Sequence, residues 1–221
     1  MKSVVWSAQG KHSNQNEDAC YARPDKGLFA VADGVGGGPA GELASRRTIE
    51  ILSEQLDSGE VKQDLILRAI QTANGEVKEY ASKTGNEGMA CTLALAWING
   101  TGLHCFHVGD SRIYRLRGQV LEQLTQDHAA LVVKSDARLK SVITRAIGIK
   151  VDIDAEISSF EWQNSDVLVL MSDGVSDKLS NTDILRIMTD ATLSMSDKAR
   201  RLTWESEIRG GVDDKTVVLA F

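Results

Sequence analysis

The feature that most constrains this chain is an apolar run that leads directly into an Asp-Gly pair. The run Leu28–Ala32 is followed by Asp33-Gly34-Val35 and then by three more glycines. A strand that ends on aspartate holds the carboxylate at a sheet edge, and glycines there let another group approach closely. A second apolar run, Val167–Met171, leads into Ser172-Asp173-Gly174. We expect these two strands to bring two carboxylates to one cation site, although each Asp-Gly pair alone is also typical of a β-turn.

Further aspartates follow strand-like segments or lie in loops next to glycine. Asp18 ends a polar connector, Asp110 joins two strand-like segments, and Asp213 precedes the last strand-like segment. Isolated acidic residues usually lie on a solvated surface, whereas clustered carboxylates repel one another unless a cation compensates their charge. Oxygen ligands suit Mg²⁺ or Mn²⁺ rather than zinc, and two such ions about 4 Å apart can orient a hydroxide on phosphorus. The residues alone therefore favour a carboxylate metal site, with phosphoester hydrolysis as one use.

Charge and composition restrict the class of protein. The net charge is −6, from 25 basic and 31 acidic residues, which argues against general binding to nucleic acid or to an anionic membrane. No apolar run reaches the length of a membrane span, and the first residues lack the apolar core of a secretory signal. The three widely spaced cysteines form no zinc pattern. We read them as reduced core residues of a cytoplasmic protein.

Hydrophobic periodicity predicts one α+β domain over residues 1–221 with a largely antiparallel core. Turn signals such as Asn99-Gly100 separate the expected strands, and apolar positions at helical spacing mark the expected helices. Residues 126–150 show only weak periodicity. The expected strands are 2–8, 19–23, 27–33, 90–98, 102–109, 111–117, 119–124, 152–160, 166–172 and 215–221, and the expected helices are 39–56, 62–82, 181–190 and 195–208.

Taken together, the motifs resemble the bacterial metal-dependent serine/threonine protein phosphatases of the 2C type. They occur in the order of that family and span nearly the whole chain, which makes the set specific although each motif alone is weak. The motifs are Asn16-Glu17-Asp18, Val31-Ala32-Asp33-Gly34-Val35-Gly36-Gly37, Gly109-Asp110-Ser111-Arg112-Ile113-Tyr114, Leu124-Thr125-Gln126-Asp127-His128, Ile143-Thr144-Arg145-Ala146-Ile147-Gly148, Ser172-Asp173-Gly174-Val175-Ser176-Asp177 and Gly210-Gly211-Val212-Asp213-Asp214-Lys215-Thr216.

The resemblance implies a four-layer α-β-β-α sandwich with two central antiparallel sheets flanked by helix pairs. It also implies a centre of two Mn²⁺ or Mg²⁺ ions, at which a metal-activated hydroxide attacks a phosphoserine or phosphothreonine monoester directly. Matched by motif, Asp33 would bridge both metals, and Asp173 and Asp213 would hold the first. The second metal would take Asp18, the Gly34 carbonyl and Glu17, and Asp110 with Asp173 matches the third metal of bacterial members.

The chain departs from the family pattern at several positions. Ser13 stands where the family usually has the arginine that grips the substrate phosphate, and Gly38 stands where many bacterial members have histidine. Asp214 replaces the usual asparagine and adds a charge beside the metals, and Ala90-Cys91-Thr92 replaces Gly-Thr-Thr. Residues 129–142, which we call the flap, are expected to be shorter than the family norm.

Three residues are candidates for contact with substrate in place of the missing arginine and histidine, and two others are candidates for structural roles. Lys11 and Ser13 are the candidates for phosphate contact, and His12 is the candidate proton donor near the phosphate. Lysine lacks the bidentate fork of arginine, so the grip on phosphate should be weaker. We expect His128 to order its loop and Arg112 to pair with a nearby acid. The metal ligands therefore match the family, whereas substrate grip and proton donation differ.

The expected partners are phosphorylated proteins and a serine/threonine kinase whose action the chain reverses, with no nucleic acid and no membrane, and the chain is expected to be a monomer. An alternative is a catalytically weak relative that binds phosphoproteins or a kinase as a regulator, and a third is a phosphatase for a partner-switching anti-sigma antagonist. We expect the flap to bury little surface and to leave the cleft open. The alternative for the flap is a compact loop-helix packed on Leu131 and Leu139.

Overall fold

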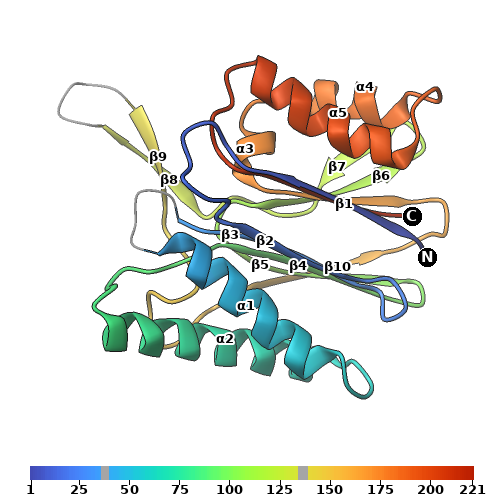
Figure 1. Cartoon of the computed structure of the whole chain (residues 1–221). Helices are drawn as coiled ribbons and strands as arrows, with labels where there is room; N and C mark the ends of the chain where they lie inside the picture. The colour runs from blue at the N-terminus through green and yellow to red at the C-terminus, as the bar shows by residue number, and fades with distance from the viewer. Residues whose placement is uncertain (36–39, 134–138) are drawn as a thin grey trace.

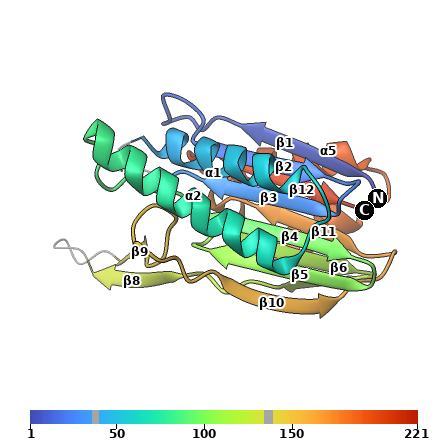
Figure 2. The ribbon, with the colours of Figure 1, turned by 90° about the horizontal axis from the view of Figure 1, so that it is seen from below.

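The computed structural model describes residues 1–35, 40–133 and 139–221, and it arranges them in four layers (Figure 1). Two antiparallel sheets lie face to face in the middle. Helices α1 and α2 cover the lower sheet, and helices α4 and α5 cover the upper one. Figure 2, seen from below, shows α1 and α2 lying across the strands they cover. The expected α-β-β-α sandwich is therefore confirmed.

Within the described ranges the upper and lower sheets have five strands each. The upper sheet has the order β1-β12-β11-β6-β7, and the lower sheet has the order β10-β5-β4-β3-β2. The first and last strands of the chain thus pair with each other. The upper strands are β1 (Ser3–Ala8), β12 (Lys215–Ala220), β11 (Val167–Met171), β6 (Arg112–Arg117) and β7 (Val120–Gln123). The lower strands are β10 (Glu156–Glu161), β5 (Gly102–Val108), β4 (Leu93–Asn99), β3 (Leu28–Asp33) and β2 (Asp18–Arg23).

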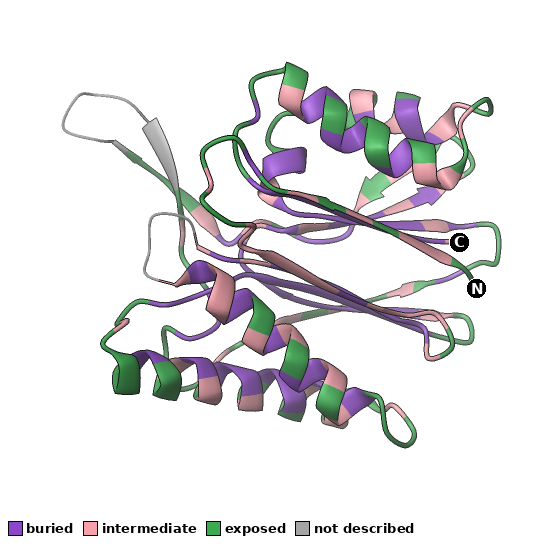
Figure 3. Cartoon of the chain, in the orientation of Figure 1, coloured by how far each residue is buried: buried purple, intermediate pink, exposed green. Residues whose placement is uncertain are grey.

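The central strands are apolar throughout because each of their faces meets another layer. On β3, Leu28 and Ala30 pack toward α1 and α2, whereas Phe29 and Val31 pack between the two sheets. Successive side chains of a strand point to opposite faces, so an unbroken apolar run fits a strand that is buried on both sides. Figure 3 shows the central strands of both sheets and the inner sides of the helices as buried.

The helices follow the periodicity of the sequence. They are α1 (Gly41–Leu56), α2 (Gln63–Thr84), α4 (Asn181–Thr189) and α5 (Met195–Ile208). Ser180 and Ser194 accept the backbone N–H groups of Asp183 and Asp197 and so cap α4 and α5. Such caps satisfy backbone donors that would otherwise lack a partner at the first turn. Pro39, with which the first helix was expected to begin, lies outside the described residues.

Two elements were not expected from the sequence. A short helix, α3 (Asp173–Ser176), begins at the second strand-end aspartate. The weakly periodic region forms β8 (Ala129–Val133) and β9 (Leu139–Ile143), which pair with each other and project from the sandwich (Figure 1). The loop-helix alternative for the flap is therefore wrong, and Leu131 is 72% exposed instead of packed. No helix among the described residues has the length and apolarity needed to cross a membrane.

Candidate active site

Strand register brings the first two aspartates together. Asp18 begins β2 and lies opposite Asp33, which ends β3. Asp33 has the same parity as Phe29 and Val31, whose side chains pack between the sheets. Both carboxylates therefore belong to the inner face of the lower sheet, at the end of the sandwich where β3 stops.

The alternation of side chains along the upper sheet also places polar groups between the two sheets, near Asp18. Ser172 continues the inner face of β11, and its hydroxyl donates to Asp18 Oδ2 across the sheets at 2.8 Å. The N–H of Thr216 donates to the Ser172 hydroxyl at 2.9 Å. Asp173, the next residue, begins α3. The two Asp-Gly signals of the sequence thus meet between the sheets.

Burial and mutual repulsion raise the proton affinity of these carboxylates. Burial raises the pKa of Asp18 to about 7, against the opposing effect of the Thr216 and Ser172 hydroxyls. Burial and then the charge of Asp18 raise the pKa of Asp33 well above its usual value. Burial and then the charge of Asp110 raise the pKa of Asp173 to about 7. Buried carboxylates that lie this close together are stabilised when they bind protons or a cation.

A polar cleft of about 660 Å³ is lined by Glu17 and Asp173, the sequence neighbours of Asp18 and Ser172, whereas Asp18 and Asp33 are not among its lining residues. Asp110 lies in the turn between β5 and β6, and burial raises its pKa to about 6. The residues that line the cleft are His12, Ser13, Asn14, Gln15, Glu17, Val35, Asp110, Val142, Ile143, Asp173, Asp177, Val212 and Asp213.

The donor set fits a hard divalent cation. Asp18 Oδ1 and Asp110 Oδ1 are buried and have no hydrogen-bond partner. A buried carboxylate oxygen without a partner is costly, and a metal ion would satisfy it. In the part of the chain that the structure describes, no three acidic, histidine or cysteine side chains close a coordination shell by themselves. This arrangement suits Mg²⁺ and Mn²⁺, because Mg²⁺ keeps several waters and binds through few carboxylates.

Asp214 was expected to add a charge beside the metals, and its oxygens also hold the connector that carries Glu17. One oxygen accepts the N–H of Gly10 at 2.6 Å, and the other accepts the N–H of Glu17 at 2.7 Å. Asp214 is 3% exposed. A side chain at Gly10 would lie 2.4 Å from the Val212 carbonyl, so the connector approaches closely because that residue is glycine. This role was not predicted from the sequence, although Asp214 has the same parity as Val218 and Ala220, which pack between the sheets.

Glycine also allows helix α1 to approach Asp33. A Cβ on Gly34 would lie 2.5 Å from the backbone of Gly41, the first residue of α1. The N–H of Gly34 donates to the Glu17 carbonyl at 3.1 Å. The Ser45 hydroxyl donates to the same carbonyl at 2.5 Å. These contacts fix the backbone of the Glu17–Asp18 pair against the helix.

The candidates for phosphate contact separate in the structure. His12 and Ser13 line the cleft, whereas Lys11 Nζ pairs with Glu207 on α5 at 3.0 Å. Arg112 pairs with Asp127 at 2.6 Å, as expected. The structure therefore directs Lys11 and Arg112 toward protein carboxylates.

His128 joins the cleft to the base of the flap, as its expected role in ordering the loop requires. Its Nδ1 accepts the N–H of Gly109 at 3.2 Å, and its Nε2 lies 3.0 Å from Glu156 Oε2. Its backbone N–H donates to the Gly109 carbonyl at 2.7 Å, and its carbonyl accepts the N–H of Thr144 at 2.7 Å. The turn that carries Asp110 is thus held by one buried histidine.

The comparisons with known proteins agree with this geometry. The family profile named protein phosphatase 2C matches residues 8–207. The serine/threonine phosphatase stp of Listeria monocytogenes is 30% identical over 95% of this chain and 90% of its own length. The serine/threonine protein phosphatase PstP of Mycobacterium tuberculosis is 32% identical over the whole chain, which covers 45% of that longer protein.

Solved structures give the same result. The Mycobacterium tuberculosis phosphatase PstP superposes with a TM-score of 0.87 at 29% identity, covering 99% of this chain and 97% of that one. The catalytic domain of PstP in complex with two manganese ions superposes with a TM-score of 0.84 at 30% identity, covering 99% and 96%.

Proposed function

This chain belongs to the protein phosphatase 2C family and is a metal-dependent serine/threonine protein phosphatase, and we propose that its strand-end carboxylates form the catalytic metal centre. The observation that carries the assignment is the convergence of Asp18, Asp33 and Asp173, whose pKa values are raised by burial. In this proposal Asp33 serves both metals and Asp173 and Asp213 hold the first. Asp18, the Gly34 carbonyl and Glu17 serve the second, and Asp110 with Asp173 serves a third.

The chain's own residues orient these ligands. The Ser172 hydroxyl fixes one oxygen of Asp18 and leaves the other for a cation. The ammonium group of Lys215, which is 1% exposed, donates to the Asp213 carbonyl at 2.7 Å. When bound, the metal ions offset the repulsion among the carboxylates and activate water for attack on phosphorus. His12, exposed at the rim of the cleft, can protonate the leaving alkoxide in this proposal.

Localisation, oligomeric state and partners complete the proposed function. We propose that the protein acts as a cytoplasmic monomer on phosphoproteins and opposes a serine/threonine kinase. A catalytically weak regulator remains the second candidate, because Ser13 replaces the usual arginine and Lys11 is paired with Glu207. A phosphatase acting on a partner-switching antagonist differs only in its substrate.

Turnover of a phosphothreonine peptide with Mn²⁺ tests the assignment. We expect activity that vanishes in excess EDTA and returns with Mn²⁺, and calorimetric Mn²⁺ binding that is weakened in Asp173→Asn. Unchanged turnover in EDTA would contradict the metal centre. Full metal binding without turnover would instead favour the regulator.

The phosphate grip is tested by Ser13→Arg. If one charge-assisted contact is gained, kcat/KM should rise about tenfold, which corresponds to roughly 1.4 kcal/mol. The gain should lie mainly in KM, because binding that is equal in ground and transition states leaves kcat unchanged. Ser13→Lys is the matched control and should gain less, since lysine lacks the fork. No gain from arginine would mean that another cation already holds the phosphate.

A further inference from the structure

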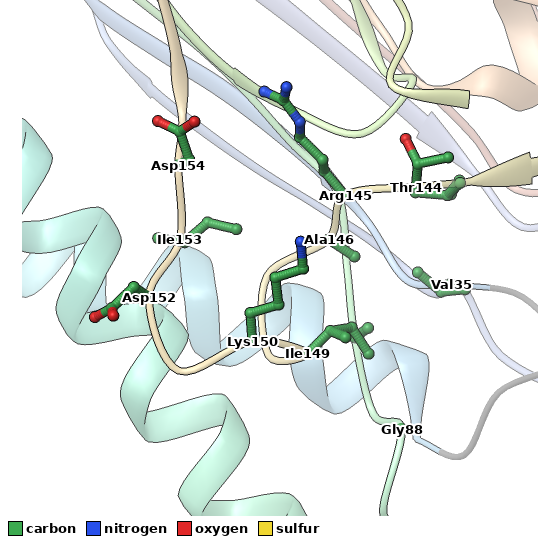
Figure 4. A pocket seen from close by; sticks show the side chains of 12 residues that line it. Val35, Gly88, Thr144, Arg145, Ala146, Ile149, Lys150, Asp152, Ile153 and Asp154 are labelled. Atoms are coloured by element: carbon green, nitrogen blue, oxygen red, sulfur yellow. The ribbon is translucent and has the colours of Figure 1, made fainter. Parts of the chain in front are cut away.

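A second cavity, of about 440 Å³, lies beside the metal cleft, and its lining is shown in Figure 4. Val35 and Ile143 line both cavities, so the two cavities adjoin each other. Val35 follows the strand-end Asp33-Gly34 pair, and Ile143 ends β9 at the base of the flap. The apolar part of the lining consists of Val35, Ala90, Ile143, Ala146, Ile149 and Ile153.

The outer wall of this side pocket is fixed to α2. Asn74, which is fully buried, accepts the N–H of Gly148 at 2.8 Å and donates to the carbonyl groups of residues 150–151 at 3.0 Å. Lys78 Nζ donates to the Ile149 carbonyl at 2.8 Å. Because the side-chain amide of Asn74 hydrogen-bonds the backbone of this loop at several points, it holds the loop in a single conformation.

The backbone under the pocket is fixed as well. Gly148 has φ +94°, and a Cβ there would lie 2.5 Å from Val77 Cγ1 and 2.7 Å from the Met89 carbonyl, so this loop requires glycine. Cys91 and Ile147 exchange backbone hydrogen bonds of 3.2 and 2.8 Å. The pocket is thus formed before any ligand arrives, which lowers the entropic cost of binding.

The charges around the pocket balance. Arg145 and Lys150 contribute two positive groups, and Asp152 and Asp154 contribute two negative ones. In Figure 4, Lys150 lies between Val35 on one side and Asp152 on the other. A rim without net charge over an apolar floor selects by shape and apolarity more than by charge.

We propose that this side pocket receives a large apolar side chain of the protein substrate, from a residue that flanks the phosphorylated serine or threonine. The inference rests on the proposed function, because the side pocket shares Val35 and Ile143 with the cleft that would hold the phosphoresidue. The flap is not needed for this contact. The exposed flap residues Leu131 and Val132 line neither cavity, whereas Val142, next to Ile143 at the base of the flap, lines the metal cleft. The proposed sequence preference therefore arises in the side pocket next to the base of the flap.

The test is a panel of phosphothreonine peptides in which leucine or phenylalanine replaces alanine at each flanking position in turn. We expect one position to raise kcat/KM by about tenfold or more, the discrimination typical of a small aliphatic difference in an apolar pocket. In Ile149→Asp the ratio between the apolar and alanine peptides should fall toward one. Ile208→Asp, which changes an exposed isoleucine on α5, is the matched control and should keep the ratio.

The ratio of kcat/KM between the apolar and alanine peptides tests the side pocket, whereas turnover itself tests the proposed function. A wild-type enzyme that turns over every peptide equally, or an Ile149→Asp variant that keeps the full preference, would overturn the side pocket while leaving the phosphatase intact. An equal loss of preference in Ile208→Asp would also overturn it. Wild-type protein that turns over no peptide with Mn²⁺ would contradict the proposed function itself. If Ile149→Asp does not fold, Ile149→Ala provides the same comparison and should lower the ratio partially.

Discussion

The carboxylate centre and the flap lie side by side at one end of the sandwich and are built in opposite ways. Asp18 and Asp33 are held by strand register, a hydroxyl from the opposite sheet and backbone bonds to Glu17. The described flap strands pair with each other, and Leu131 and Val132 are exposed. The centre therefore tolerates little change, whereas the flap should tolerate replacement.

The substitution Asp33→Asn should give the largest difference in activity between a change in the carboxylate centre and a change in the flap. The proposed bridging role in two metal sites predicts a loss of kcat of several orders of magnitude. Val132→Asn, a change of an exposed flap residue, is the matched control and should retain nearly all activity. Steady-state kinetics on one phosphopeptide with Mn²⁺ measures both. An Asp33→Asn variant within tenfold of the wild type would remove the distinction between the two regions.

The metal-free centre should make stability depend on pH. Burial raises the pKa values of Asp18 and Asp173 in the folded state from the ordinary 3.8 to about 7, so the folded state binds protons more tightly than the unfolded state. Stability in excess EDTA should therefore fall as pH rises from about 5 to 8. Urea denaturation over that range measures the slope. The slope should be smaller in Asp18→Asn, and a metal-free protein that gains stability with rising pH would contradict the raised pKa values.

Asp214→Ala should weaken the centre through its connector. The N–H groups of Gly10 and Glu17 would lose their acceptor, and each loss costs about 1–3 kcal/mol when buried. We expect a loss of about 2–4 kcal/mol in the free energy of unfolding and a Tm lower by several degrees. Asp64→Ala, an exposed carboxylate in the first turn of α2, should cost less than about 1 kcal/mol. Equal effects would show that Asp214 is an ordinary surface acid.

Replacement of residues 130–140 by a Gly/Ser linker should give the smallest effect. The flap is expected to leave the cleft open, so kcat/KM across unrelated phosphopeptides should change less than about threefold, which is roughly 0.6 kcal/mol. The panel of phosphothreonine peptides that tests the side pocket also measures this change in kcat/KM. A wild-type spread of several orders of magnitude that the linker abolishes would mean that the flap selects the substrate.

The sequence predicted features that depend on local pattern and missed features that depend on contacts between distant residues. Asp33 and Asp173 were predicted to converge because unbroken apolar runs mark strands buried on both faces, and such strands fix the direction of their final residues. The role of Asp214 was missed because its partners are backbone N–H groups far away in the chain, and the parity of β12 indicates the face of the sheet but not these partners. The side pocket was missed for a similar reason, since the buried amide of Asn74 looks like an ordinary helix residue in sequence.

The flap shows the other limit. Its residues have weak periodicity, and neither the β8–β9 pairing nor the short helix α3 was expected. Short elements carry little signal in the sequence, because their conformation depends on the larger body that supports them. That the flap is shorter than the family norm remains a prediction.

The position of β12 has a consequence for biosynthesis. This strand lies between β1 and β11 and carries Thr216, with Asp213 and Asp214 just before it, although it is the last strand in the chain. A nascent chain can therefore form the lower sheet and α1 with α2 on the ribosome while its ligand set is still incomplete. If Asp213 is a metal ligand as proposed, the centre can hold its ions only after residues 213–220 have emerged and β12 has inserted between β1 and β11. Synthesis itself would thus withhold activity until this segment is made.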